Sequence, residues 1–453
     1  MSSTSDIYVP LLDSHLIRHL RIEQSSTATN LQCSIWRTEL VHGSDYTALS
    51  YTWGASRPSK EMWVQSEHGW EYPPRRLYVG QNLFDFLVAY TTQPWGRSRE
   101  GVLRPRLWID QLCIDQSNTG ELSAQVSIMN KIYKRAKDVL VWLGCEAAMV
   151  EAMRQLRDHE SQADRALVMI LQHPYFSRVW IVQEIALGPK ITFVCGEVEV
   201  SWGCMEEASL RLQGNAVDRI PLQALAVTLD TRSPRYRTLQ ACFFQYSQNH
   251  CRDPRDRVYG LLGLTPERWR LRVDYTKTVL EVYLDTVVAL YEELFDVTDP
   301  KSFYPPTVQD TSDLFIYRNT MLDLAQAMGL PEHQLSGLHS FLIDIGDVYM
   351  STQVRNVRFQ LPADQLPFFR DLSEAYINYE GASRVASSTS STRMNTARRR
   401  NPLLRDVISE LGLQLAQTPR HAGQCDDDPG GPRWDRWWFT HNGRTRYFEC
   451  AIP

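Results

Sequence analysis

The sequence predicts an α/β fold, in which a mainly parallel β-sheet with crossover helices is followed by a mostly α-helical C-terminal region. Two observations lead to this prediction. In the N-terminal part, short strand-like runs alternate with helical patterns, which is typical of parallel strands joined by right-handed crossovers. From Met205 onward the strong patterns are helical, and in the clearest one, Thr276–Phe295, only Thr286 interrupts the apolar stripe.

Strands and helices are expected in a regular order along the N-terminal part. The predicted strands are residues 46–54, 106–110, 138–144 and 191–195, and the predicted helices are residues 82–90, 121–137, 146–172 and 175–188. The third strand is expected to be buried, because its apolar run is unbroken. Gly188 followed by Pro189 is a typical helix stop.

The chain divides into segments of different composition. We expect a lead-in packed on the domain that follows (1–45), the α/β domain (46–204), a helical C-terminal region (205–380), a disordered Ser- and Arg-rich linker (381–402), and a C-terminal helix with an aromatic hairpin (403–453). The hairpin should turn at His441-Asn442-Gly443 and dock on the body of the protein.

Composition limits the class of protein. A chain of 453 residues is too long for one compact core, and its net charge of -5 argues against a nucleic-acid binder. Nine scattered Cys without a CxxC pair favour reduced thiols over disulfides or a zinc site. The N-terminus lacks the pattern of a signal peptide, and no apolar run is long enough to span a membrane. We therefore expect a cytoplasmic protein with neither metal nor resident cofactor.

One glutamate stands in an apolar helix. Glu184 is surrounded by Val, Ile and Leu and lies one helical turn after Trp180. A carboxylate buried there must be paired, protonated or used chemically, because burying a bare charge is costly. Two interpretations remain open: a structural carboxylate satisfied by Arg178 or a backbone amide, and a general acid/base or charge stabiliser.

The ends of the predicted strands mark where a ligand would bind. Parallel sheets bind ligands beyond the carboxyl ends of their strands, which here are Ser50–Gly54, Asp110–Gln116 and Leu143–Glu146. A catalytic Glu184 requires that its helix border the same crevice. The chain has no GxGxxG or Walker loop. Cys113 has no His fixed near it in the sequence, so a structural thiol is the preferred interpretation.

Long blocks of residues in a fixed order indicate a family. They are Tyr46-x-Ala48-Leu49-Ser50-Tyr51-x-Trp53-Gly54; Leu107-Trp108-Ile109-Asp110-x-x-Cys113-Ile114-Asp115-Gln116 with Glu121, Gln125, Met129, Ile132-Tyr133 and Ala136; and Phe176-x-Arg178-x-Trp180-x-x-Gln183-Glu184. Together they closely resemble the fungal heterokaryon-incompatibility (HET) domain over roughly residues 46–196. Asp253–Leu264 also resembles the segment that often follows this domain, whereas the family's glycine-rich ending is absent after Phe448.

The resemblance implies a fold and a site. HET domains are regarded as remote relatives of TIR domains, which have a flavodoxin-like parallel sheet and, in the enzymatic members, cleave the nicotinamide–ribose bond of NAD. Their catalytic glutamate follows a Trp by four positions, as Glu184 follows Trp180. By this analogy Glu184 is the catalytic carboxylate. The residues implied for the NAD pocket are Trp180, Tyr51, Trp53, Trp108 and Asp110. Core packing for the aromatics and a loop-capping role for Asp110 remain the alternatives.

Two functions from different classes follow from the resemblance. The first is a cell-death effector of heterokaryon incompatibility, similar to innate-immunity proteins, that cleaves NAD as its substrate. The second is a non-enzymatic signalling module that acts through oligomerisation and protein–protein contacts. In both, the expected partners are a second copy of the chain and an unidentified non-self-sensing or signalling protein, and the helical C-terminal region is expected to control oligomerisation or autoinhibition.

Overall fold

A computed structural model gives the fold of most of the N-terminal half and of parts of the C-terminal half. The residues it describes are 7–11, 13, 15–23, 25–27, 29–41, 45–54, 57–67, 73–97, 106–159, 162–214, 238–267, 270–294, 311–330, 360–361, 433–441 and 444–452.

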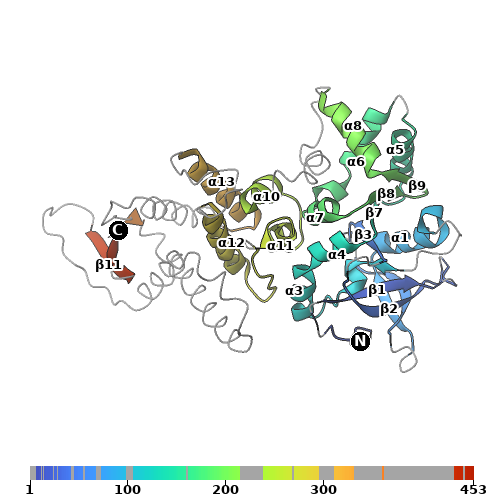
Figure 1. The fold of residues 1–453 in the computed structure, drawn as a ribbon, viewed down its shortest axis with the longest axis horizontal. Coiled ribbons are helices and arrows are strands. Elements are labelled where there is room, and N and C mark those ends of the chain that lie inside the picture. The colour runs from blue at the N-terminus through green and yellow to red at the C-terminus, as the bar shows by residue number, and fades with distance from the viewer. Residues whose placement is uncertain are drawn as a thin grey trace.

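A nine-stranded sheet forms the centre of the α/β part, in the order β5-β4-β2-β1-β6-β3-β7-β8-β9 (Figure 1). Its strands are β1 (Leu16–Ile22), β2 (Gln32–Glu39), β3 (Thr47–Tyr51), β4 (Lys60–Gln65), β5 (Arg75–Val79), β6 (Leu107–Trp108), β7 (Asp138–Trp142), β8 (Ile191–Cys195) and β9 (Val198–Ser201). The middle strands β6, β3, β7 and β8 are parallel, in the register Ala48↔Trp108, Ser50↔Val141 and Val141↔Phe193. The predicted α/β class is therefore confirmed, and its parallel part coincides with the four predicted strands.

Antiparallel strands extend this parallel centre on both sides. β9 pairs with β8 at one edge, and on the other side β1 pairs with both β6 and β2. β4 then joins β2 in parallel, and β5 closes the edge antiparallel to β4. The first strands of the chain thus lie inside the sheet, next to β6.

Helices cover the sheet and differ in detail from the predicted ones. They are α1 (Gln81–Thr92), α2 (Asp110–Cys113), α3 (Thr119–Ser127), α4 (Met129–Arg135), α5 (Ala147–Arg157), α6 (Ala163–Leu171), α7 (Trp180–Leu187) and α8 (Trp202–Gly214), with short 3-10 turns η2 (Pro94–Gly96) and η3 (Pro174–Ser177). The predicted helix 121–137 is divided at Ile128, and its two halves form α3 and α4. The predicted helix 146–172 is also divided, because His159 has a positive φ of 53° that ends α5. The predicted strand 106–110 is shorter than expected, since Asp110 already begins α2.

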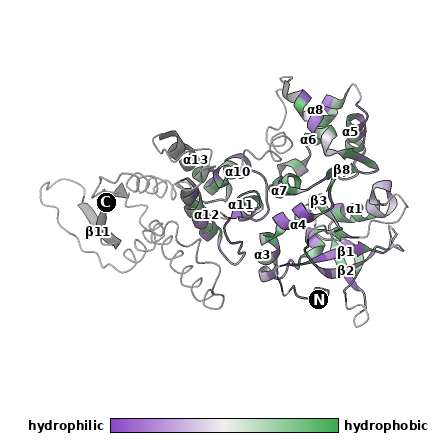
Figure 2. Ribbon diagram, in the orientation of Figure 1, coloured by the Kyte–Doolittle hydropathy of each residue, from purple (hydrophilic) through white to green (hydrophobic). Residues whose placement is uncertain are grey.

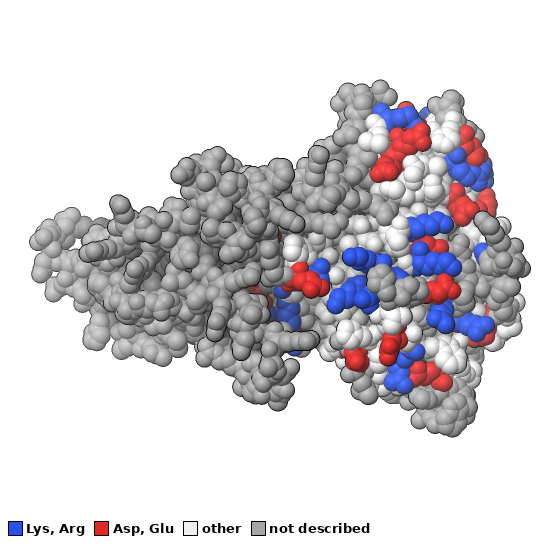
Figure 3. All heavy atoms as spheres, in the orientation of Figure 1, with Lys and Arg blue, Asp and Glu red and all other residues white. Residues whose placement is uncertain are grey.

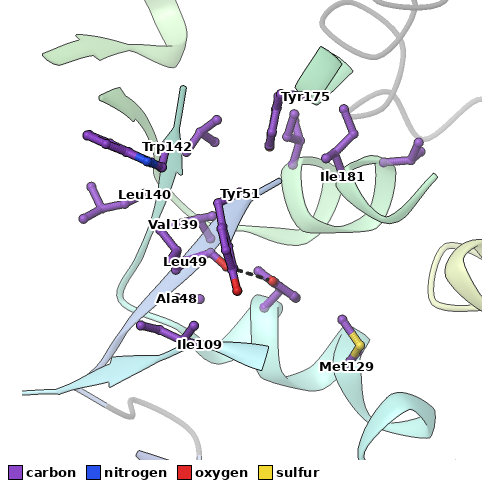
Figure 4. Close-up of a cluster of buried hydrophobic side chains, with 14 of the residues drawn as sticks. Ala48, Leu49, Tyr51, Ile109, Met129, Val139, Leu140, Trp142, Tyr175 and Ile181 are labelled. Carbon is purple, nitrogen blue, oxygen red and sulfur yellow. Dashed lines mark hydrogen bonds between the residues drawn. The ribbon is translucent and has the colours of Figure 1, made fainter. Parts of the chain in front are cut away.

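The core lies between the central strands and the helices. Every residue of β3 and β7 is buried, which confirms the prediction for the apolar run of residues 138–144. Hydrophobic residues concentrate in the central strands (Figure 2). Figure 4 shows Tyr51 and Tyr175 among apolar side chains such as Leu49, Val139 and Ile181, between the strands and α7. Hydrophobic burial of this extent is the main force that stabilises the fold.

A group of helices, named here the helical region, lies beside α7 and α4 (Figure 1). It contains α10 (Leu239–Tyr246), α11 (Asp256–Leu262), α12 (Val279–Leu294) and α13 (Thr311–Ala327). α12 confirms the helix expected at residues 276–295. Its Tyr283 hydroxyl donates to the Met321 carbonyl at 3.3 Å and so connects α12 with α13.

The end of the chain forms a hairpin. β11 (Arg433–His441) pairs antiparallel with β12 (Arg444–Ile452), with His441 opposite Arg444. Asn442 and Gly443 of the predicted turn lie outside the described residues. β10 (Gln360–Leu361) adds to β12 in parallel. The linker expected at residues 381–402 and the helix expected after residue 403 lie outside the described residues.

The described surface of the α/β part carries charges of both signs, interspersed over the face that Figure 3 shows. Among the helices of the described residues, none combines the length and apolar character needed to cross a bilayer.

Candidate functional site

A buried carboxylate site lies where α7 meets the carboxyl end of β3. The side chain of Glu184 points at the sheet, where the Ser50 hydroxyl donates to its Oε2 atom. The hydroxyl of Tyr175 lies 2.6 Å from Ser50 Oγ. Both Glu184 and Ser50 are almost completely buried, at 2% and 1% exposure. The direct partner of the carboxylate is therefore a hydroxyl group of the strand.

The surroundings of Glu184 favour its protonated form. Burial raises the pKa of Glu184 to about 7 and outweighs the positive charge of Arg178 and the hydrogen bond from Ser50, which both lower it. The negative charge of Asp110 adds to the increase, and Tyr133 opposes it. A carboxyl group with this pKa is partly ionised near neutral pH, which is the state required of a general acid/base or of a charge stabiliser.

A second carboxylate stands at the neighbouring strand end. Asp110 begins α2, directly after β6, and its Oδ2 atom accepts the indole N–H of Trp53 at 2.9 Å. Next to it, the Tyr51 hydroxyl donates to Gln111 Oε1 at 2.9 Å. Burial raises the pKa of Asp110, whereas Arg178 and the bond from Trp53 act in the opposite direction. Trp53, Asp110 and Gln111 are partly exposed, so this cluster forms the outer side of the site.

Arg178 connects the two carboxylates electrostatically. It precedes α7, its guanidinium donates to the Tyr51 carbonyl, and its charge lowers the pKa of both Glu184 and Asp110. If Glu184 were a purely structural carboxylate, Arg178 was expected to be its partner. The Arg178 guanidinium does lower the pKa of Glu184 through its charge. The hydrogen bond that Glu184 accepts from a side chain comes from Ser50 instead.

Two of the predicted pocket residues pack elsewhere. Trp108 is fully buried in β6, and its ring meets that of Tyr133 edge to face at 5.5 Å. The indole N–H of Trp180 donates to Asp256 Oδ2 in the helical region at 3.1 Å. The structure therefore brings Glu184, Tyr51, Trp53 and Asp110 to one end of the sheet, and it directs Trp180 towards α11.

Sequence reasoning missed the hydroxyl groups of the site. Ser50 is one of two polar residues, with Thr47, in a strand that is buried throughout, and a buried polar residue near the end of such a strand is the signal that points to it. Tyr175 and Tyr133 come from η3 and α4, and both have their pKa raised by burial first and by the charge of Glu184 second. No sequence spacing relates these tyrosines to β3, since only the fold brings them together.

Cys113 is fully buried, and burial raises its pKa to about 12, so its thiol stays protonated at neutral pH. Cys33, Cys113, Cys145, Cys195, Cys204, Cys242 and Cys251 are free thiols. Within the described residues, His, Cys, Asp and Glu side chains form no group of three or more that could hold a metal ion.

Comparison with known proteins finds a family match that covers the residues of the site. Residues 46–184 match the family model described as heterokaryon incompatibility protein (HET). A protein of Neurospora crassa named heterokaryon incompatibility protein 6, OR allele, is 27% identical over 362 residues. The alignment covers 61% of this chain and 52% of the relative, so the chain spans about half the length of the curated relative it matches. No solved structure matches the chain.

Proposed function

We propose that the protein is a heterokaryon-incompatibility effector that cleaves NAD at the bond between nicotinamide and ribose, because residues 46–184 match the heterokaryon-incompatibility (HET) family model. The name of the Neurospora crassa relative supports the biological part of this proposal. The single observation that carries the chemical part is the Glu184 carboxyl group, which is buried, bonded to Ser50 and shifted to a pKa of about 7 at the carboxyl end of a parallel strand.

The reaction needs charge stabilisation more than it needs acid catalysis. Nicotinamide leaves as a neutral base with the electron pair of its bond to ribose, and positive charge develops on the ribosyl carbon. A carboxylate beside the ribose stabilises this charge. Water then adds to the ribosyl carbon and loses a proton, which gives ADP-ribose. Ionised Glu184 is the proposed stabiliser.

The partly exposed cluster would receive the rest of the substrate. Trp53 offers partly exposed aromatic surface at the strand end, and the Asp110 carboxylate and the Gln111 amide offer hydrogen-bond partners for hydroxyl groups. Tyr51 lies beside them and is buried, at 2% exposure. Glu184 lies behind this cluster and is 2% exposed. The proposal therefore requires that side chains or α7 move before the carboxylate meets a ribose.

The test is nicotinamide release by the full-length protein incubated with NAD. We expect Glu184→Gln to abolish release, because a neutral amide of the same shape cannot stabilise the ribosyl cation. Tyr283→Phe, a change inside the helical region, serves as the folded control and should release nicotinamide like the wild type. If the wild type releases no nicotinamide, even when concentrated, the enzymatic proposal fails. The alternative function, a non-enzymatic signalling module that acts through oligomerisation, then remains.

A further inference from the structure

The helical region holds the backbone on both sides of Arg178. The His250 N–H donates to the Ser177 carbonyl at 2.6 Å, and the Val179 N–H donates to the His250 carbonyl at 3.0 Å. These bonds make a parallel β-bridge between Arg178 and His250. The buried side chain of Asn249 also donates to the Arg178 carbonyl, at 3.3 Å. A segment some 70 residues further along the chain thus fixes the start of the helix that carries Glu184.

A second set of contacts joins α7 to α11. Asp256 Oδ2 accepts the Trp180 indole N–H at 3.1 Å, and its Oδ1 accepts the Tyr275 hydroxyl at 2.6 Å. The glycines of α11 allow a close approach of the two helices. A Cβ atom on Gly260 would lie 3.3 Å from Val179, and one on Gly263 would lie 2.2 Å from Gln183 Oε1. The backbone at Gly260 in α11 and at Gly263, the residue that ends this helix, therefore lies directly against side chains of Val179 and Gln183. A larger residue at Gly263 would have to displace the Gln183 side chain.

Arg178, whose backbone the helical region holds, supplies the positive charge of the carboxylate site. Its guanidinium donates to the Tyr51 carbonyl, and its charge lowers the pKa of both Glu184 and Asp110. The helix that follows has only eight residues, and a helix this short is marginal without tertiary contacts. The position of Arg178 relative to the sheet therefore depends on the contacts of its backbone, which are with Tyr175 of η3 and with Asn249 and His250 of the helical region.

From these contacts we infer that the helical region positions Arg178 and thereby keeps Glu184 partly ionised, so that undocking of α10–α11 from α7 switches the carboxyl group further towards its protonated form. In this scheme His250, Asn249, Trp180 and Asp256 are positioning residues. The consequence for catalysis rests on the proposed NAD cleavage, whereas the coupling itself concerns the charge of one carboxyl group and is measured without substrate.

The direction of the switch follows from the groups that face Glu184. Removing the charge of Arg178 leaves desolvation and the negative charge of Asp110, which both raise the pKa of Glu184. The remaining neighbours are hydroxyl groups and cannot replace a cation. The groups that face the carboxyl group are Ser50 and Tyr51 on β3, Asp110 on α2, Tyr133 on α4, Tyr175 on η3 and Arg178 before α7.

The experiment measures the ionisation of Glu184 in the full-length protein. The carboxyl signal is followed against pH by infrared or carbon NMR spectroscopy, and Glu184→Gln identifies it. The interface is weakened by Trp180→Phe combined with Asn249→Ala, which removes the indole donor to Asp256 and the amide donor to the Arg178 carbonyl. Gly263→Val is a second, independent wedge between α11 and α7. Tyr283→Phe is the matched control, since it removes a hydrogen bond within the helical region and leaves α7 untouched.

We expect the midpoint of Glu184, near 7 in the wild type, to rise by about one unit in both interface variants and to stay unchanged in the control. Nicotinamide release by these variants should fall at neutral pH and recover at higher pH, which a merely structural defect would not produce. An unchanged midpoint in both interface variants overturns the inference. A shifted midpoint in a protein that releases no nicotinamide preserves the coupling and removes only the proposed reaction.

Discussion

At the scale of single residues, the important feature is a carboxyl group whose direct partner is neutral. Glu184 accepts a hydrogen bond from Ser50, and the nearby charge of Arg178 lowers the pKa of Glu184 by less than burial raises it. A direct ion pair would hold such a carboxyl group fully ionised at neutral pH. The hydroxyl partner instead leaves it close to its titration midpoint, so small movements of charged neighbours can change its state.

The raised pKa of Glu184 predicts a pH dependence of stability. Because its folded-state pKa of about 7 lies above its ordinary value of 4.5, Glu184 contributes stability that is fully present below pH 4.5 and is lost as the pH rises through 7. Unfolding of wild type and Glu184→Gln by urea at several pH values checks this. The unfolding free energy of the wild type, relative to that of Glu184→Gln, should fall by on the order of 3 kcal/mol between pH 4 and 8.

A difference between wild type and Glu184→Gln that stays constant with pH would contradict this prediction. Asp158 offers a control, because Arg157 lowers the pKa of this exposed carboxylate, and Asp158→Asn should therefore show no such loss at rising pH.

At the scale of elements, α7 is confined by close packing at both of its ends. Its start is bonded to the helical region, as described above, and its end is packed against the sheet. A Cβ atom on Gly188, the C-cap residue, would lie 2.6 Å from Ile191 and 2.7 Å from Val139. Gly188 has an ordinary negative φ, so this glycine is required for space rather than for backbone conformation. The helix thus has little freedom to shift along the sheet.

Gly188→Ala should therefore destabilise the protein by about 1–3 kcal/mol, because the added methyl group overpacks the contact of α7 with β7 and β8. Gly120→Ala is the matched control in α3. The atom nearest to its added Cβ lies at an ordinary 3.4 Å, so this change should be neutral or stabilise by up to about 1 kcal/mol. Thermal and urea unfolding measure both variants. Equal effects of the two substitutions would show that space around Gly188 does not limit the packing of α7.

At the scale of the whole molecule, the first strands are integral to the α/β part. β1 lies between β2 and β6, and its Arg18 is 1% exposed. The guanidinium forms a bidentate ion pair with Glu121 at the start of α3, with distances of 2.5 and 2.9 Å. Glu121 in turn accepts the backbone N–H of Asp115 at 2.7 Å. One buried ion pair therefore connects the start of the chain, the loop after β6 and α3.

Removing one partner of this pair should cost far more than removing both. Arg18→Met is expected to destabilise by about 3–5 kcal/mol, because it leaves Glu121 as an uncompensated buried charge, and Arg18→Met/Glu121→Leu should recover most of this loss. A double-mutant cycle, measured by urea unfolding, gives the coupling free energy between Arg18 and Glu121. Arg154→Ala breaks an exposed pair with Glu151 and should change stability by less than about 1 kcal/mol. Additive effects of the two core substitutions would contradict a buried ion pair.

Much of this organisation could be predicted from local patterns. The strands containing Ser50, Trp108 and Val141 and the helix of Glu184 follow from apolar runs and period, which depend on neighbouring residues only. The breaks at Ile128 and His159 were not predicted, since both lie within continuous helical patterns. The antiparallel strand β1 was not predicted either, because pairing between distant strands leaves no local signal.

The sequence by itself determined the α/β class, the helix that carries Glu184 and the match of residues 46–184 to a family model, because these depend on periodicity and on residues at fixed spacing. Only the tertiary structure decided which groups surround that glutamate. Ser50, Tyr175 and Arg178 lie around it and come from separate elements. Trp180, one helical turn before it, donates its indole N–H to Asp256 instead. The charge state of a buried carboxyl group depends on solvent exclusion and on charges within a few ångströms, and folding alone assembles both.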